Sequence, residues 1–247
     1  MGYTKKYWNT PIGKVVEEYH TAAQPPPGGR REKRAPTPEE MEKANQRQKH
    51  RKAQLLLMNN FRADDYFITL TYRPDERPAD LQECQRQFRN FIARLRRAYE
   101  KSGEQLKWIR NIEVGSRGAW HIHFVVNRIR DTDILIRRNW RYGHPKSVLM
   151  YEEGGFRKLA DYMTKASAGL PPGQKGDCYS HSRNLVMPKE HKREVKGNIV
   201  SRGKFRAIRI PDGYYLDKES LYEGINAYTG YPYRYYVLLR TRGGYIP

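Results

Sequence analysis

The feature that most constrains the fold is a pair of strand-like runs separated by a very short turn. The run "LKWIRNIEVG" covers residues 106–115, "SRG" covers 116–118, and "AWHIHFVVN" covers 119–127. Two runs rich in branched and aromatic residues on either side of such a turn predict an antiparallel hairpin. The chain must therefore contain an antiparallel sheet, and its neighbouring segments decide how that sheet is covered.

The segments around the hairpin alternate between strand and helix patterns. Apolar residues recur at three- and four-residue steps in the predicted helices, which makes these helices amphipathic. In chain order we expect a strand at 66–72, a helix at 79–101, the two hairpin strands, a helix at 132–140 that Asp131 caps, a strand at 147–151 and a helix at 154–167. This order predicts an α+β fold with a central, mostly antiparallel sheet and helices packed against it.

Composition divides the chain into four predicted regions. Residues 1–36 include "PPPGGRREKRAP", which cannot build a core, and are predicted to be a flexible basic segment. An accessory helix is expected at 37–62, starting after Thr37. The core domain is assigned to 63–175, and 176–247 to a basic C-terminal extension packed on the core. This extension has strand patterns at "FRAIRI" and "YRYYVLLR", and we interpret "CYSH", residues 178–181, as a loop.

The charge balance favours a polyanionic partner. Lysine and arginine number 47 against 27 acidic residues, a formal net charge of +20. Nucleic acid is the first candidate, although a basic protein without that role remains open. Candidate contacts are the basic residues of the core and the aromatic–basic run "YPYRYY": Arg110, Arg117, Lys158, Tyr233, Arg234 and Tyr235. No membrane-spanning run or secretory signal is seen, and two isolated cysteines fit a reducing cytoplasm.

The hairpin also carries a possible metal site. His121 and His123 are two residues apart and would share one strand face, opposite to Trp120 and Phe124. They are either a buried, hydrogen-bonded pair or part of a cation site. Glu113 lies across the turn, where an antiparallel partner strand would bring its carboxylate beside them. Two imidazoles and one carboxylate leave coordination positions open, which suits a catalytic Mn²⁺ or Mg²⁺ ion.

A candidate nucleophile lies on the last predicted helix. Tyr162 and Lys165 are three residues apart and would be neighbours on the helix surface. A phenol is a weak nucleophile until a nearby cation stabilises the phenolate, and Lys165 could supply that charge or hold a phosphate. The chain has 19 tyrosines, so this interpretation depends on the metal site beside it.

These motifs resemble those of the HUH endonucleases, and within them the rolling-circle replication initiators of small plasmids and phages. "YFITLTY" resembles their first motif, "HIH" their metal motif and "YMTK" their tyrosine motif, in the family's order. The resemblance implies a ferredoxin-like core and a divalent metal held by Glu113, His121 and His123. It also implies that Tyr162 nicks single-stranded or hairpin origin DNA and becomes joined to its 5′ end. Ala166 stands where many phage initiators have a second tyrosine, so the chain resembles the single-tyrosine type.

The resemblance further implies a cytoplasmic, nucleoid-associated enzyme of a bacterial host that works with a host helicase and polymerase. Three alternatives remain open at this point. A transposase or relaxase of the same superfamily would use the same chemistry on another substrate. A non-catalytic nucleic-acid-binding module would use neither metal nor tyrosine, and a metal-dependent phosphoesterase would use water and form no adduct.

Overall fold

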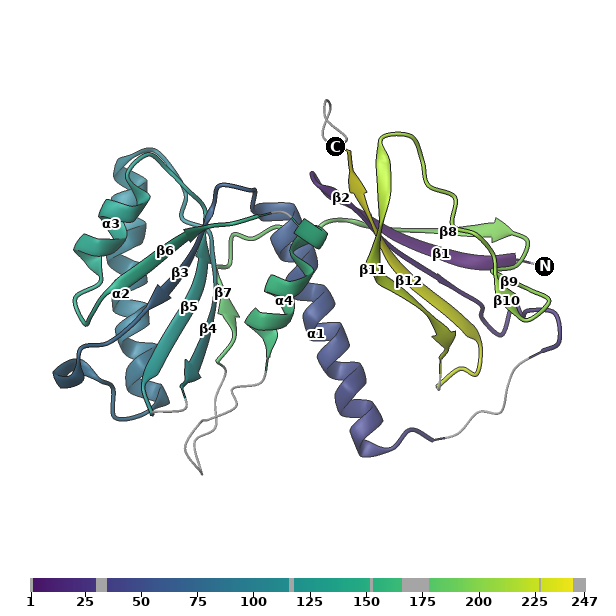
Figure 1. Cartoon of the computed structure of the whole chain (residues 1–247), viewed down its shortest axis with the longest axis horizontal. Helices are drawn as coiled ribbons and strands as arrows, with labels where there is room; N and C mark the ends of the chain where they lie inside the picture. The colour runs from purple at the N-terminus through teal and green to yellow at the C-terminus, as the bar shows by residue number, and fades with distance from the viewer. Residues whose placement is uncertain are drawn as a thin grey trace. The chain divides into compact units, whose positions relative to one another are not determined.

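The computed structural model describes residues 2–29, 35–115, 118–151, 153–165, 178–226 and 228–241 (Figure 1). The chain divides into two compact units, neither of which is continuous in sequence. The terminal unit consists of Met1–Asn59, Glu153–Lys158 and Met187–Pro247, and the central unit of Asn60–Glu152 and Leu159–Val186. None of the helices in the described part of the chain has the length and apolar composition needed to cross a bilayer.

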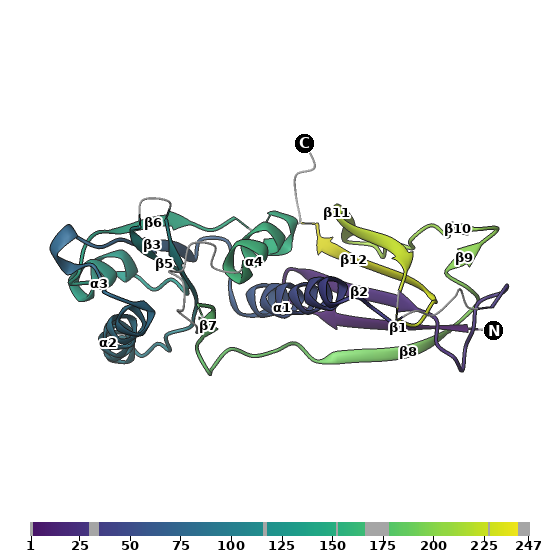
Figure 2. The same cartoon turned by 90° about the horizontal axis from the view of Figure 1, so that it is seen from below.

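The central unit is an antiparallel sheet with helices on one face. Its strand order is β6–β3–β5–β4–β7, and every neighbouring pair is antiparallel. The strands are β3 (Tyr66–Leu70), β4 (Trp108–Val114), β5 (Trp120–Val126), β6 (Pro145–Leu149) and β7 (Ser180–His181). The helices are the short η1 (Pro74–Glu76), α2 (Leu81–Lys101), α3 (Thr132–Asn139) and the part of α4 (Arg157–Thr164) from Leu159 onward. Figures 1 and 2 show α2 and α3 on the same face of this sheet. The α+β class with antiparallel strands is confirmed.

The core of the central unit lies between α2 and the sheet. The Asp80 side chain caps α2 by accepting a hydrogen bond of 2.7 Å from the Glu83 N–H. The apolar stripe of α2, including Phe88 and Phe91, packs on Phe124 of β5. This packing covers one face of the sheet. The side chains of every second residue in each strand point to the opposite face.

Two expectations for the central unit are wrong in detail. Residues 178–181 were expected to be a loop, but Ser180 and His181 form β7 and pair with β4. Arg110 stabilises this arrangement by donating a hydrogen bond to the Cys178 carbonyl. Asp131 does not cap α3 with its side chain, and the Thr132 hydroxyl accepts the Ile129 N–H in the preceding turn.

The terminal unit contains a second five-stranded antiparallel sheet, of order β11–β12–β2–β1–β8. Its strands are β1 (Gly2–Asn9), β2 (Gly13–Tyr19), β8 (Glu190–Lys196), β11 (Tyr214–Ile225) and β12 (Pro232–Arg240). A separate hairpin is formed by β9 (Val200–Ser201) and β10 (Lys204–Phe205). The helix α1 (Pro38–Asn60) and the 3₁₀ turn η2 (Glu153–Phe156) complete the described elements. A capping box starts α1, because the Thr37 and Glu40 side chains accept each other's backbone N–H.

The predicted division into four regions needs correction at both ends of the chain. Residues 1–36 were expected to be flexible, but residues 2–19 form β1 and β2 in the interior of the second sheet. The region 176–247 was expected to extend the core, and its first part does so through β7, but β8 and β12 pair with β1 and β2. The strand predicted at 233–240 is confirmed as β12, whereas the one predicted at 205–210 is limited to Phe205 at its first position.

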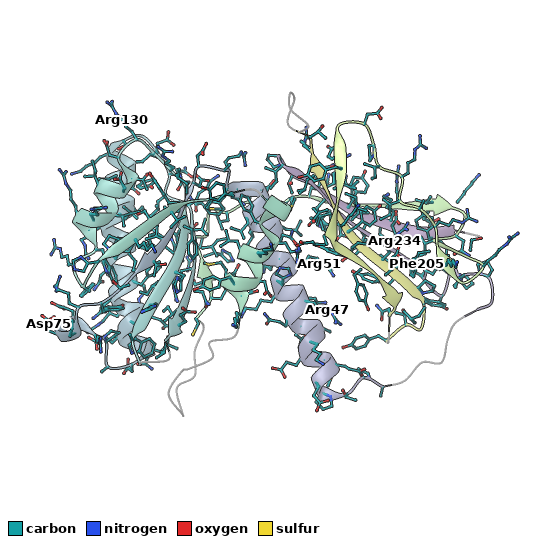
Figure 3. The ribbon with its side chains drawn as sticks, viewed as in Figure 1. Arg47, Arg51, Asp75, Arg130, Phe205 and Arg234 are labelled. Carbon is teal, nitrogen blue, oxygen red and sulfur yellow. The ribbon has the colours of Figure 1, made fainter. Side chains whose placement is uncertain are left out.

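A cluster of buried ion pairs explains why the first two strands were overlooked. The Glu18 carboxylate accepts hydrogen bonds from Lys5, Arg234 and Tyr236. Burial alone would raise the pKa of Glu18, but Lys5 and Arg234 together lower it. The neighbouring Glu17 is also buried and pairs with Arg51 of α1. Because these two glutamates are paired and buried, β2 has the sequence pattern of an exposed strand. Figure 3 labels two of the cations in these pairs, Arg51 and Arg234.

Candidate active site

The β4–β5 hairpin brings the predicted metal ligands together by its register. Glu113 is paired with His121, and Asn111 with His123, so all four side chains share the sheet face opposite to the core. On the other face, Ile122 and Phe124 are fully buried against α2. Side chains on one face of β5 therefore pack in the core, and the other face carries the candidate metal ligands.

Glu113, His121 and His123 form a group whose ligand atoms all lie within 4.8 Å of one another. The His123 Nε2 and Glu113 Oε1 atoms are 2.8 Å apart. Two imidazole nitrogens and a carboxylate oxygen are donors that fit a divalent cation, and three protein ligands leave positions for substrate or water. The side-chain oxygen of Asn111, on the same face, is buried and makes no hydrogen bond within the described residues, which adds a polar group near His123.

His123 is oriented by a residue of the neighbouring strand. Its Nδ1 lies 3.1 Å from the Thr69 hydroxyl of β3, and its ring stacks on Phe67. Burial lowers the pKa of His123 and outweighs the opposing effect of Glu113, so the imidazole is held in its neutral form. A neutral ring with Nδ1 hydrogen-bonded to Thr69 can present the Nε2 lone pair to a cation.

Tyr162 lies beside this group. It is on α4, and its hydroxyl donates a hydrogen bond of 3.3 Å to Glu113 Oε1. Its ring is 5.1 Å from the His123 ring, at an interplanar angle of 79°. Burial and the negative charge of Glu113 both raise the pKa of Tyr162. A cation bound to Glu113 would oppose the second of these effects.

The other predicted catalytic residue is less closely associated with the site. Lys165 follows the last residue of α4 and has an exposed side chain. The hydroxyl of Tyr162 has a carboxylate as its partner and not this ammonium group. Arg117 and Ala166 lie outside the described residues.

Most of the predicted nucleic-acid contacts have structural partners instead. Arg110 is 7% exposed and packs over the Phe88 ring, and Arg234 is 3% exposed and bonded to Glu18, so neither guanidinium can reach a nucleic acid. The Tyr233 hydroxyl is bonded to Glu17, and the Tyr235 hydroxyl to Gln54 of α1. Of this group only Lys158 is exposed among the described residues.

The sequence analysis missed Thr69, Phe67 and Asn111. Their alternation within each strand was visible, but their position beside His123 depends on strand order and register. Asn111 could have been found, because it is two residues from Glu113 and therefore on the same face of the predicted strand.

Comparison with known proteins finds a similarity in the part of the chain that contains this site. Residues 65–167 match the family model for the replication-associated protein ORF2/G2P. This segment, which is less than half of the chain, is similar to that family. It contains Glu113, the two histidines and Tyr162, and it confirms the resemblance to replication initiators. No match was found among curated proteins or among solved structures.

Proposed function

We propose that this replication-associated protein is a metal-dependent endonuclease that nicks and rejoins one DNA strand and thereby initiates rolling-circle replication. The observation that carries the proposal is the convergence of the Tyr162 hydroxyl and the His123 imidazole on one carboxylate oxygen of Glu113. A phenol adjacent to a group of metal-ligand type is the arrangement that a covalent phosphodiester transfer needs.

Glu113, His121 and His123 would hold the cation, and their nitrogen and oxygen donors suit Mn²⁺ or Mg²⁺. When bound, such an ion neutralises charge on the non-bridging oxygens of a phosphate. Thr69 keeps the His123 ring in the orientation that this binding requires.

Tyr162 would act as the nucleophile. Its phenolic oxygen forms a bond to the scissile phosphorus, and the bond from phosphorus to the 3′ oxygen breaks. The proton lost from the phenol is balanced by the one that the released 3′ hydroxyl gains. The product is a 5′-phosphotyrosine, which keeps the energy of the original diester, so the reverse step can rejoin strands without ATP. The freed 3′ hydroxyl can prime synthesis by a host polymerase, with a host helicase for unwinding.

The substrate proposed is single-stranded or hairpin DNA at a replication origin. A transposase or relaxase with the same chemistry would differ in substrate and not in these residues. The family match to a replication-associated protein favours the initiator.

The test is to incubate the full chain with Mn²⁺ and labelled single-stranded oligonucleotides from its own replicon. We expect a protein–DNA adduct that survives denaturation and is absent for Tyr162→Phe. Tyr151→Phe is the matched control, because Tyr151 is 77% exposed in the same unit and should leave adduct formation unchanged.

The other outcomes distinguish the competing functions. Cleavage without an adduct would contradict the proposal in favour of a phosphoesterase. DNA binding without cleavage of any origin sequence would favour a non-catalytic module.

A further inference from the structure

The terminal unit carries a basic hairpin that the family match does not cover. We define it as residues 199–209, which include β9 and β10. It has four cationic residues and no acidic one, and all four are exposed: Arg202, Lys204, Arg206 and Arg209. The preceding strand β8 and the residue before it have four more exposed cations, Lys189, Lys192, Arg193 and Lys196, beside two exposed glutamates, Glu190 and Glu194. Figures 1 and 2 show β9 and β10 at the end of the terminal unit where β1 begins.

An arginine occupies a costly position at the tip of this hairpin. Arg202 and Gly203 connect β9 to β10 and have φ values of 49° and 77°. Two-residue turns of this kind prefer Asn or Gly, because a larger side chain is strained in the left-handed region. An arginine in this strained turn position suggests a role for its side chain.

The hairpin is fixed to the sheet below it. Ile199 is 1% exposed, and Ile208 packs against a buried cluster that includes Tyr236. The buried Arg234 guanidinium donates a hydrogen bond to the Arg206 carbonyl while it is paired with Glu18. Arg234 is therefore a positioning residue that holds the hairpin in place.

We propose that the basic hairpin binds the phosphate backbone of duplex DNA, which gives the protein a second DNA contact outside its candidate active site. The exposed guanidinium and ammonium groups match phosphate charges, and a two-stranded β-ribbon is narrow enough to enter a DNA groove. A single-strand site would need rings for stacking. Phe205 is half-buried and His191 of β8 is stacked on Tyr7, so residues 189–209 present no exposed aromatic ring.

This inference rests on the proposed function in one respect, which is that the partner is DNA. The test measures binding of a mixed-sequence duplex without origin sequence, and of a single strand of equal length, by fluorescence anisotropy over increasing KCl. The variant is Arg202→Asn, Lys204→Gln and Arg206→Gln together. The matched control is Arg130→Gln, Arg137→Gln and Arg138→Gln, three exposed arginines of the central unit.

We expect duplex affinity to fall about 10- to 100-fold in the hairpin variant, and the slope of log K against log[salt] to become shallower by about 2 to 3. The control removes the same charge but should lose less than about threefold, because its three arginines lie outside the proposed contact. Arg202→Lys with Arg206→Lys, which keeps the charge, should retain most of the binding. Thermal unfolding of each variant establishes that the fold is intact.

Equal losses in the hairpin variant and the control would overturn the proposal, because binding would then follow net charge alone. A larger loss on the single strand than on the duplex would also overturn it. The hairpin variant should still form the Tyr162 adduct on single-stranded oligonucleotides. The two proposals can fail separately. If the wild type forms no adduct but the hairpin variant loses duplex binding, the result supports the hairpin contact and contradicts the proposed function.

Discussion

Each unit of the molecule places a glutamate in a polar cluster on one face of a five-stranded antiparallel sheet, but the partners differ. Glu18 in the terminal unit is bonded to Lys5 and Arg234, and its side chain is 3% exposed. Glu113 in the central unit is bonded to the His123 imidazole and the Tyr162 phenol, and its side chain is 32% exposed.

The comparison shows what separates a structural carboxylate from one suited to catalysis. Lys5 and Arg234, the positively charged partners of Glu18, belong to the same chain, so the charge of Glu18 is already balanced in the folded state. The partners of Glu113 are groups that are neutral at ordinary pH, and its charge is therefore left for a cation from solution. Substitutions at the two sites should accordingly affect different properties of the protein.

The largest expected effect is on chemistry at the central site. Glu113→Gln should lower the rate of metal-dependent nicking by more than about a thousandfold, equivalent to about 4 kcal/mol in the barrier. The free energy of unfolding should change by less than about 1 kcal/mol, because the carboxylate is partly exposed. Quench-flow nicking and urea unfolding measure the two effects. A large loss of stability would contradict the comparison.

The next effect is on stability at the terminal site. Glu18→Gln leaves the buried Arg234 guanidinium with only the partly exposed Glu223 carboxylate, 3.4 Å away, as its counter-charge, and should lower the free energy of unfolding by about 3–5 kcal/mol. Glu190→Gln breaks the exposed pair with Lys6 and serves as the control, with a cost below about 1 kcal/mol. Urea unfolding of both variants gives the difference, and similar costs for the two would contradict the structural role of Glu18.

A smaller effect is expected at the residue that orients His123. Thr69→Val keeps the side-chain shape but removes the hydroxyl that contacts Nδ1, and should weaken Mn²⁺ binding about 10- to 100-fold. Calorimetric titration with Mn²⁺ measures this, and Thr69→Ser should restore the affinity. Unchanged affinity in the valine variant would mean that Thr69 has only a packing role.

The two glutamates also differ in their effect on acid stability. The folded-state pKa of Glu18 lies below its unfolded value, so its stabilising contribution is present above about pH 4.3 and is lost as pH falls through the folded pKa. The stability difference between the wild type and Glu18→Gln should therefore shrink on acidification below about pH 4. Urea unfolding at several pH values checks the sign, and a gap that widens toward acid would contradict it.

The sequence predicted the central unit well because its information is local. The hairpin turn, the two-residue alternation of His121 and His123 and the apolar stripe of α2 each depend on residues close together in the chain. The sequence predicted that Glu113 and Tyr162 lie near the histidines, from the place of Glu113 across the hairpin turn and of Tyr162 on the last helix, and the structure brings them together. Thr69 could not be assigned, because its contact with His123 depends on β3 lying next to β5.

The sheet of the terminal unit could not be predicted because the pairings that join its parts are remote in sequence. β1 pairs with β2 and β11 with β12 as local hairpins, but β2 also pairs with β12 and β1 with β8, so no local pattern shows that these strands form one sheet. The buried Glu17 and Glu18 conceal the strand further, since charged residues normally indicate solvent exposure. The sequence also does not show that Arg234 is buried. Arg234 was therefore predicted to contact nucleic acid, whereas in the structure it supports the sheet and the basic hairpin.

The interleaving of the two units has a consequence for synthesis on the ribosome. The central unit has all its strands once residue 186 has emerged, whereas the sheet of the terminal unit waits for β12 near the end of the chain. During that interval β1 and β2 form an unpaired hairpin whose edges can associate with other chains. Slow translation or truncation near the 3′ end of the message should therefore produce aggregates that contain an otherwise folded central unit.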